Sequence, residues 1–212
     1  MGLYDRRKLS NGAEISIWEI TEDEDDLRQK CSPIPNDELE ELQITKSASR
    51  RKEKLAVRAL LNEMFPEKVY LGHHDNGRPY LQNSAIEISI THCSKYVAII
   101  THPDSDVGID IESIDRDFSA VEKKVLSEEE QDDLTDRNTN LQLAIYWCAK
   151  ETIYKRMSRS GVDFAEQICL EKFNPKNDGE LEATFTHKDG TEEYFELEYE
   201  VFDRHVLVWM VG

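Results

Sequence analysis

The chain has little that would tie it to a membrane, a nucleic acid or an oxidising compartment. No apolar run approaches the roughly 20 residues that a membrane span requires. Lys and Arg number 26 against 44 Asp and Glu, a formal net charge of −18 without a long basic run, so nucleic acids and anionic membranes are disfavoured partners. The four cysteines are scattered, with no Cys-x-x-Cys pair, and the first residues lack the apolar region of a signal peptide. We therefore expect reduced thiols and a cytoplasmic location.

The length of the chain and a turn-forming segment near its middle indicate two halves. A length of 212 residues allows one large or two small domains. A His-Pro-Asp-Ser-Asp segment at 102–106 is typical of a boundary, and we place an N-terminal half at 1–104 and a C-terminal half at 105–212. Each half is predicted to hold a small antiparallel sheet packed on a long helix. The fold is then α/β (α+β) and duplicated in architecture, one compact globule with its ligand in the cleft between the halves. By analogy, a two-halved single chain favours a monomer.

The N-terminal half alternates strand and helix signals. We expect strands at 13–20, 85–91 and 95–101, the last two joined as a hairpin, an acidic solvated turn at 21–26, a short helix capped by Asn36 or Asp37, a longer helix at 46–65, and a turn at 75–79. The long helix begins with basic residues, among them Arg51 and Arg58. In so acidic a chain these either bind phosphate or are exposed solubilising charges, and the two interpretations are about equally supported.

The C-terminal half holds two acidic motifs. Residues 107–111 are β-branched except for Gly108 and Asp110, which favours a buried strand, and period-2 alternation puts Asp110 and Glu112 on one face. A helix predicted at 140–157 places Glu151 and Lys155 on one face by their i, i+4 spacing. Ser127 and Glu130 fit a capping box. Strands are expected at 167–172, 181–187, 192–202 and 205–211, with a hairpin turn at 189–190.

The two motifs together predict a magnesium–pyrophosphate site. Carboxylate oxygens are ligands that Mg²⁺ prefers, and phosphates complete its coordination shell. Asp110, Glu112 and Glu151 would hold the metal, while Lys150 and Lys155 would neutralise phosphate oxygens. Either motif alone is more often a solvated strand edge or helix surface, so the prediction depends on their combination. His92, at the end of a predicted strand, is by itself more typical of a surface residue than of a ligand.

These motifs resemble the signature pair of 4′-phosphopantetheinyl transferases, and within them the long, single-chain type that serves secondary-metabolite synthases. The resemblance is carried by Gly108-Ile109-Asp110-Ile111-Glu112 and by Trp147-x-x-Lys150-Glu151-x-x-x-Lys155. Three shorter segments are similar too, and the basic residues of the helix at 46–65 fall where the family has a basic helix. The shorter segments are Gly77-Arg78-Pro79-Tyr80, Ser89-Ile90-Thr91-His92-Cys93 and Leu126-Ser127-Glu128-Glu129-Glu130.

The resemblance implies a reaction and a set of roles. The phosphopantetheine arm of coenzyme A would pass to a serine of an acyl or peptidyl carrier protein, with adenosine 3′,5′-bisphosphate as the other product. It assigns Mg²⁺, with Mn²⁺ as the alternative, to Asp110, Glu112 and Glu151, and proton abstraction to Glu151. Lys155, together with Lys150, would meet phosphate oxygens. The 3′-phosphate and adenine end of coenzyme A would lie against Arg51, Arg58, Arg78, Thr91 and His92.

Two alternative hypotheses about function remain beside phosphopantetheinyl transfer. A degenerate member of the family would bind coenzyme A or a carrier protein without transfer, although a mere binder has no need of Glu151. An unrelated metal-dependent phosphohydrolase would use the same carboxylates, but we expect it to carry more ligating His or Asp residues. Thr91 and Cys93 replace serines that are usual around His92 in the family; the threonine hydroxyl still donates to phosphate, whereas a thiol is a poorer donor.

Overall fold

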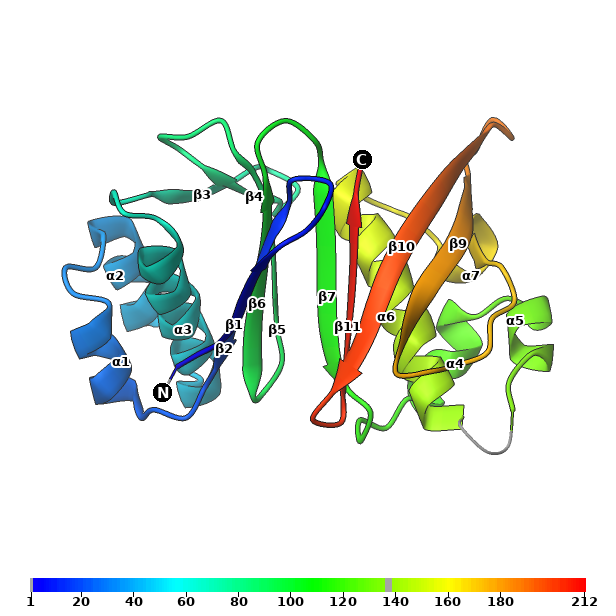
Figure 1. Ribbon diagram of the computed structural model, residues 1–212, viewed down its shortest axis with the longest axis horizontal. Helices are drawn as coiled ribbons and strands as arrows, with labels where there is room; N and C mark the ends of the chain where they lie inside the picture. The colour runs from blue at the N-terminus through cyan, green and yellow to red at the C-terminus, as the bar shows by residue number, and fades with distance from the viewer. Residues whose placement is uncertain (1, 136–138) are drawn as a thin grey trace. The chain divides into compact units, whose positions relative to one another are not determined.

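The computed structural model describes residues 2–135 and 139–212 and has a mixed α/β architecture with antiparallel sheets (Figure 1). This confirms the fold class expected from the sequence. The chain forms two compact units, Met1–Asp106 and Val107–Gly212; the expected division lies two residues earlier. The duplication of the two halves stays a prediction.

The first unit is built on a four-stranded antiparallel sheet in the order β1-β2-β6-β5, beside a two-stranded β3–β4 ribbon. Strand β1 was not predicted, because this edge strand is rich in charged residues and lacks the period-2 apolar pattern by which strands are recognised. The strands are β1 Leu3–Lys8, β2 Glu14–Glu19, β3 Leu71–His73, β4 Pro79–Leu81, β5 Glu87–His92 and β6 Tyr96–His102.

Three helices complete the first unit: α1 Glu24–Lys30, α2 Asn36–Ile44 and α3 Ala48–Met64. The long helix α3 packs on β2 and β6 and buries Leu55 and Leu60 completely. The acidic turn expected at 21–26 is wrong for residues 24–26, which form the first turn of α1; Asp23 caps this helix by accepting a hydrogen bond from the Asp26 amide at 2.9 Å. The carboxylates of the first turn favour the helix N-terminus. Helix α2 has Pro35 as its N-cap, so neither Asn36 nor Asp37 caps it.

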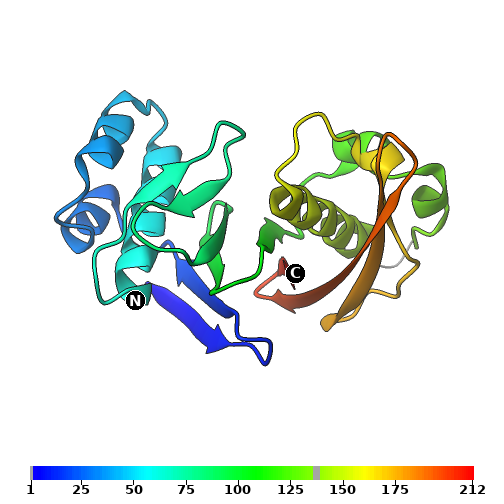
Figure 2. The same ribbon diagram turned by 90° about the horizontal axis from the view of Figure 1, so that it is seen from above.

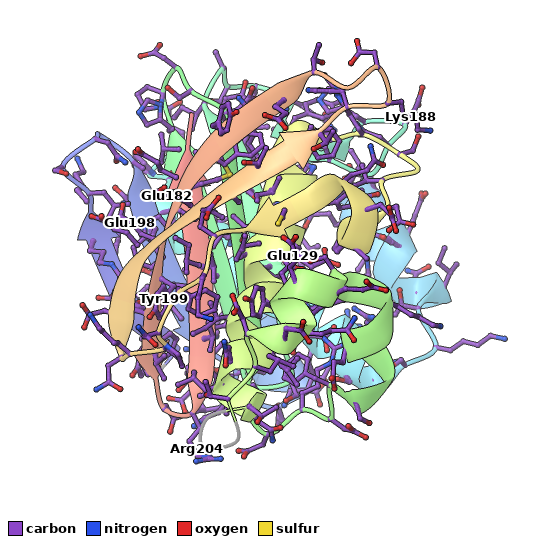
Figure 3. All side chains as sticks on the ribbon, turned by 90° about the vertical axis from the view of Figure 1, so that its right-hand side faces the viewer. Glu129, Glu182, Lys188, Glu198, Tyr199 and Arg204 are labelled. Atoms are coloured by element: carbon purple, nitrogen blue, oxygen red, sulfur yellow. The ribbon has the colours of Figure 1, made fainter. Side chains whose placement is uncertain are left out.

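The second unit holds a five-stranded antiparallel sheet in the order β7-β11-β10-β9-β8. Along β10, buried residues alternate with exposed glutamates, so one face of this strand packs on the core and the other is acidic and solvated. Glu182 on β9 and Glu198 on β10 are exposed, whereas Tyr199 is 3% exposed (Figure 3). The strands are β7 Val107–Ser113, β8 Ile168–Leu170, β9 Asp178–Thr186, β10 Glu192–Phe202 and β11 His205–Val211.

Helix α6, Thr139–Met157, lies along β7 and β11 and supplies much of the second core (Figure 2). Gly108 permits this packing, because a Cβ atom there would lie 2.3 Å from the backbone oxygen of Thr152. Shorter helices surround α6, and the capping box predicted from Ser127 and Glu130 is confirmed at the start of α5. They are α4 Ser119–Val125, α5 Glu128–Asp132 and α7 Phe164–Gln167.

The state of the cysteines and the character of the helices bear on two expectations from the sequence. Cys31, Cys148 and Cys169 are free thiols, as the scattered spacing suggested. None of the helices within the described ranges is long and apolar enough to cross a membrane.

Candidate active site

Strand β7 and helix α6 place an acidic and a basic side chain in direct contact. Asp110 is 6% exposed in the middle of β7, where an uncompensated charge would be costly. Lys155, one turn beyond Glu151 on α6, donates to Asp110 Oδ1 at 2.7 Å and to the Ile109 carbonyl oxygen at 3.1 Å. The close approach of α6 to β7 at Gly108 makes this contact possible. The i, i+4 and period-2 patterns therefore identified two elements that meet.

Glu112, two residues further along β7, has a different counter-ion. Its Oε1 accepts a hydrogen bond from Nη1 of Arg116, in the turn that follows the strand. Burial raises the pKa of the Glu112 carboxyl; Arg116 acts in the opposite direction and Asp110 adds to the rise. Arg116 was not predicted as a site residue because the turn that carries it has no motif. Its i, i+4 distance from Glu112 was the available signal.

Glu151 is the third carboxyl of this group. Burial, followed by the charge of Asp110, raises the pKa of Glu151 to about 7, although Lys155 and Arg116 both oppose the rise and Glu112 adds to it. The three carboxyls are therefore close enough to influence one another. A carboxyl that titrates near neutral pH can exchange a proton with a substrate hydroxyl; the assignment of Glu151 as general base stays a prediction.

The donor set fits a divalent cation in its chemistry. Asp110, Glu112 and Glu151 offer hard oxygen ligands of the type that Mg²⁺ takes, and their mutual repulsion is what such a cation would relieve. In the described part of the chain, however, no group of three or more His, Cys, Asp or Glu side chains is arranged to hold a metal ion. Asp110 is paired with Lys155 and Glu112 with Arg116. Lys155 binds Oδ1 of Asp110 and Arg116 binds Oε1 of Glu112, so a shared metal would compete with both cations for these carboxylates, and the predicted ligand set stays a prediction.

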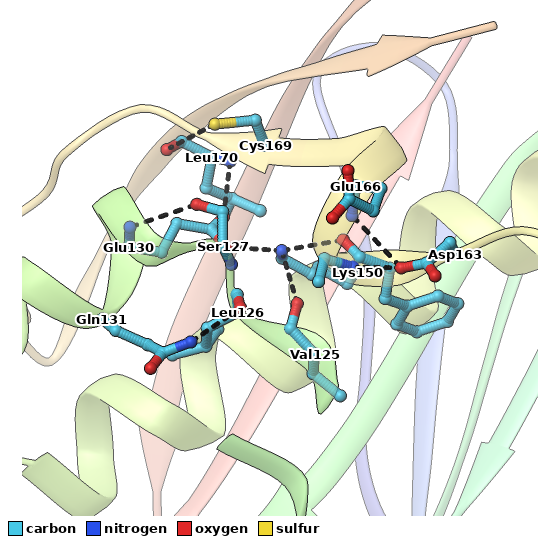
Figure 4. Close-up of polar contacts among 12 residues, drawn as sticks. Val125, Leu126, Ser127, Glu130, Gln131, Lys150, Asp163, Glu166, Cys169 and Leu170 are labelled. Atoms are coloured by element: carbon cyan, nitrogen blue, oxygen red, sulfur yellow. Dashed lines mark hydrogen bonds and ion pairs between the residues drawn. The ribbon is translucent and has the colours of Figure 1, made fainter. Parts of the chain in front are cut away.

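Lys150 differs from the expectation that it meets phosphate. Its side chain is 0% exposed, and its ammonium donates to Glu130 Oε2 at 2.6 Å and to the carbonyl oxygens of Val125 at 2.7 Å and Phe164 at 3.0 Å (Figure 4). An ammonium has three donors, and these three acceptors use them. Glu130 also accepts from the backbone amides of Ser127 and Leu170. The contacts of Lys150 therefore join α4, α5 and α7 to α6, and we assign it a structural role.

The first unit contains a cavity of about 230 Å³. Arg58 and His92, both expected at the nucleotide end of coenzyme A, line it together with Lys54, Gly77 and Pro79. Arg58 is 2% exposed, and its guanidinium is bound by Glu38 and by the Val69 carbonyl oxygen at 2.9 Å. This pair joins α2 to α3, and with the Val69 contact it uses three of the five N–H donors of a side chain that is almost fully buried. The side chains of Lys54 and His92 are each 36% exposed.

The remaining predicted ligands of the first unit are held by other groups or buried. Arg51 donates to both carboxylate oxygens of Glu24 at 3.0 Å and to two backbone carbonyls. Arg78 bridges Glu87 at 2.8 Å and Asp106 at 2.5 Å. Thr91 on β5 is 3% exposed. The sequence showed where the cations are but not that neighbouring carboxylates pair with them. Their proposed role, like the predicted cleft between the halves, stays a prediction.

By their chemistry, the carboxyls and cations of the second unit define a candidate site for a divalent cation and a phosphate-bearing ligand. Residues 106–208 match the model of the 4′-phosphopantetheinyl transferase superfamily. The chain therefore contains a domain of this superfamily, which confirms the resemblance of the two acidic motifs; the similar segments of the first unit lie outside the match, and the long, single-chain type stays a prediction. Members use coenzyme A as co-substrate, usually with a divalent metal, and act on carrier proteins. The assignment supports a transferase with phosphopantetheinyl transfer as its general function. A search of curated proteins finds no match to the chain.

Proposed function

We propose that the protein transfers the 4′-phosphopantetheine arm of coenzyme A to a serine of an acyl or peptidyl carrier protein and releases adenosine 3′,5′-bisphosphate. The observation that carries the proposal is the group formed by Asp110, Glu112, Glu151 and Lys155 within the segment that matches the superfamily. The proposal includes Mg²⁺ as the metal, with Mn²⁺ as the alternative, and a monomeric enzyme of the long, single-chain type.

Each residue of the group has a defined task in this reaction. When bound to Asp110, Glu112 and Glu151, a divalent cation would supply positive charge to the pyrophosphate of coenzyme A. Glu151 accepts the proton of the carrier serine, for which a pKa of about 7 is suited. Lys155 is 27% exposed at its side chain, so its ammonium can also meet phosphate oxygens as negative charge grows on the leaving group.

The bonds of the transfer balance without a covalent enzyme intermediate. The serine oxygen forms a bond to the β-phosphorus, and the bond between that phosphorus and the bridging oxygen breaks. Adenosine 3′,5′-bisphosphate leaves with the bridging oxygen. Positioning and charge neutralisation carry most of such phosphoryl-type transfers. For the nucleotide end of coenzyme A, we propose Arg51, Arg58, Arg78, Thr91 and His92, with the cavity beside His92 as the place to examine first.

Intact-mass measurement of several apo carrier proteins, each incubated with the protein, coenzyme A and Mg²⁺, tests the proposal. We expect one carrier to gain the mass of the phosphopantetheine arm. Asp110→Ala should abolish the gain while leaving the far-ultraviolet circular dichroism unchanged, because it removes a charged group and no apolar packing. Binding of coenzyme A without any mass gain would support the binding module instead. Bisphosphate released without a carrier would support hydrolysis.

A further inference from the structure

Arg116 is held more tightly than an ordinary surface arginine. Its guanidinium carbon lies 4.8 Å from the ring centroid of Trp147 and 5.4 Å from that of Phe118. A cation over an aromatic face is attracted by the ring quadrupole. The ion pair to Glu112 adds a third contact. Trp147 belongs to the same helix as Glu151 and Lys155, so α6 itself fixes the position of the Arg116 head group.

The ion pair with Glu112 leaves Arg116 able to bind a second anion. A guanidinium has five N–H donors in a planar fork, and the recorded bond to Glu112 is made by Nη1. The side chain is 35% exposed, against 21% for Glu112. Phosphate oxygens match the fork in geometry and charge. Arg116 therefore has the donors and the access that a phosphate-bearing ligand requires.

The charges of the site indicate when Arg116 would change partner. Two cations, Lys155 and Arg116, are paired with two of the three carboxylates. A divalent cation that takes Glu112 as a ligand competes with Arg116 for this carboxylate, whose Oε1 accepts the hydrogen bond from Arg116. The displaced guanidinium, still stacked on Trp147 and Phe118, would then be available beside the bound metal.

We propose that Arg116 is a substrate-binding residue that exchanges Glu112 for a phosphate oxygen of coenzyme A when the divalent cation binds. The inference rests on the proposed function and extends it to a residue outside the predicted ligand sets. It predicts that loss of Arg116 changes the affinities for the metal and for coenzyme A in opposite directions. The metal loses a competitor for Glu112, whereas coenzyme A loses a contact.

Two binding measurements on Arg116→Gln test the exchange. By calorimetry with Mn²⁺ or Mg²⁺ alone, we expect metal affinity to rise about 2–5-fold, the value of a partly exposed ion pair. With saturating Mg²⁺, the Kd of coenzyme A should rise about 10–100-fold, as for a lost hydrogen bond to a charged group. In the transfer assay the KM of coenzyme A should rise with little change in kcat. Arg116→Lys keeps the charge without the planar fork of donors, so both of its affinities should lie between those of the wild type and those of Arg116→Gln.

Arg156→Gln is the matched control. Arg156 also pairs with a glutamate, Glu193 at 2.7 Å, and also lies over an aromatic ring, 5.3 Å from the centroid of Phe195. It should lose comparable thermal stability while both affinities stay unchanged. The exchange is overturned if Arg116→Gln weakens metal binding, leaves the Kd of coenzyme A unchanged, or behaves like the control. Failure of the wild type to modify any carrier would contradict the proposed function instead, and the two affinities would still decide the role of Arg116.

Discussion

Two lysines on α6, Lys150 and Lys155, both form ion pairs with carboxylates, but the two pairs differ in their exposure to solvent. The pair of Lys150 with Glu130 is sealed, with side chains 0% and 2% exposed. The pair of Lys155 with Asp110 is partly accessible to solvent, with side chains 27% and 9% exposed. Both lysines belong to one sequence motif, yet only Lys155 has an ammonium that a ligand can approach. A shared motif therefore does not imply a shared role; the acceptors and the exposure of each side chain decide it.

The largest expected effect comes from breaking the sealed pair. Lys150→Met should lower the free energy of unfolding by about 3–5 kcal/mol, because it leaves the Glu130 carboxylate buried without its cation. Urea denaturation followed by tryptophan fluorescence measures this change. Lys172→Met is the matched control, since Lys172 pairs with Asp133 but is 72% exposed; it should cost about 0–1 kcal/mol. Similar losses in the two variants would contradict the structural role of Lys150.

Breaking the partly accessible pair should affect turnover more than stability. Lys155→Ala should lower kcat for transfer by about 100–1,000-fold, the range for removal of one group that stabilises transition-state charge. Its free energy of unfolding should change less than that of Lys150→Met. Stopped assays of carrier modification, with denaturation in parallel, separate the two effects. A Lys155→Ala enzyme with normal kcat would remove Lys155 from the site.

The third expected effect is a pH dependence that Glu151 contributes to stability. Its pKa in the folded protein, about 7, lies above the ordinary value of 4.5, so the folded state favours the protonated form. This contribution is fully present below pH 4.5 and is lost as the pH rises through 7. In metal-free buffer, the Tm of wild type minus that of Glu151→Gln should therefore fall between pH 4.5 and 7.5. A difference that is flat, or that rises with pH, would show that the Glu151 pKa is not raised.

Much of the fold was predictable from the sequence because the signals are local. The alternation of β10, the capping box of α5 and the i, i+4 pattern of α6 depend on neighbours within a few residues. The same locality explains the failures: β1 is a polar edge strand, and the helical first turn of α1 was mistaken for an acidic loop. Of the site, the sequence indicated the acidic residues and Lys155, whereas Arg116 lay in a turn without a motif.

By itself the sequence determined which elements carry the acidic and basic groups, since the periods of strands and helices place side chains on particular faces. Only the tertiary structure decided which groups meet. It paired Lys155 with Asp110, buried Lys150 against Glu130 and stacked Arg116 on Trp147. The reason is that charge interactions and burial depend on distance and solvent access in space, and sequence separation does not specify either one.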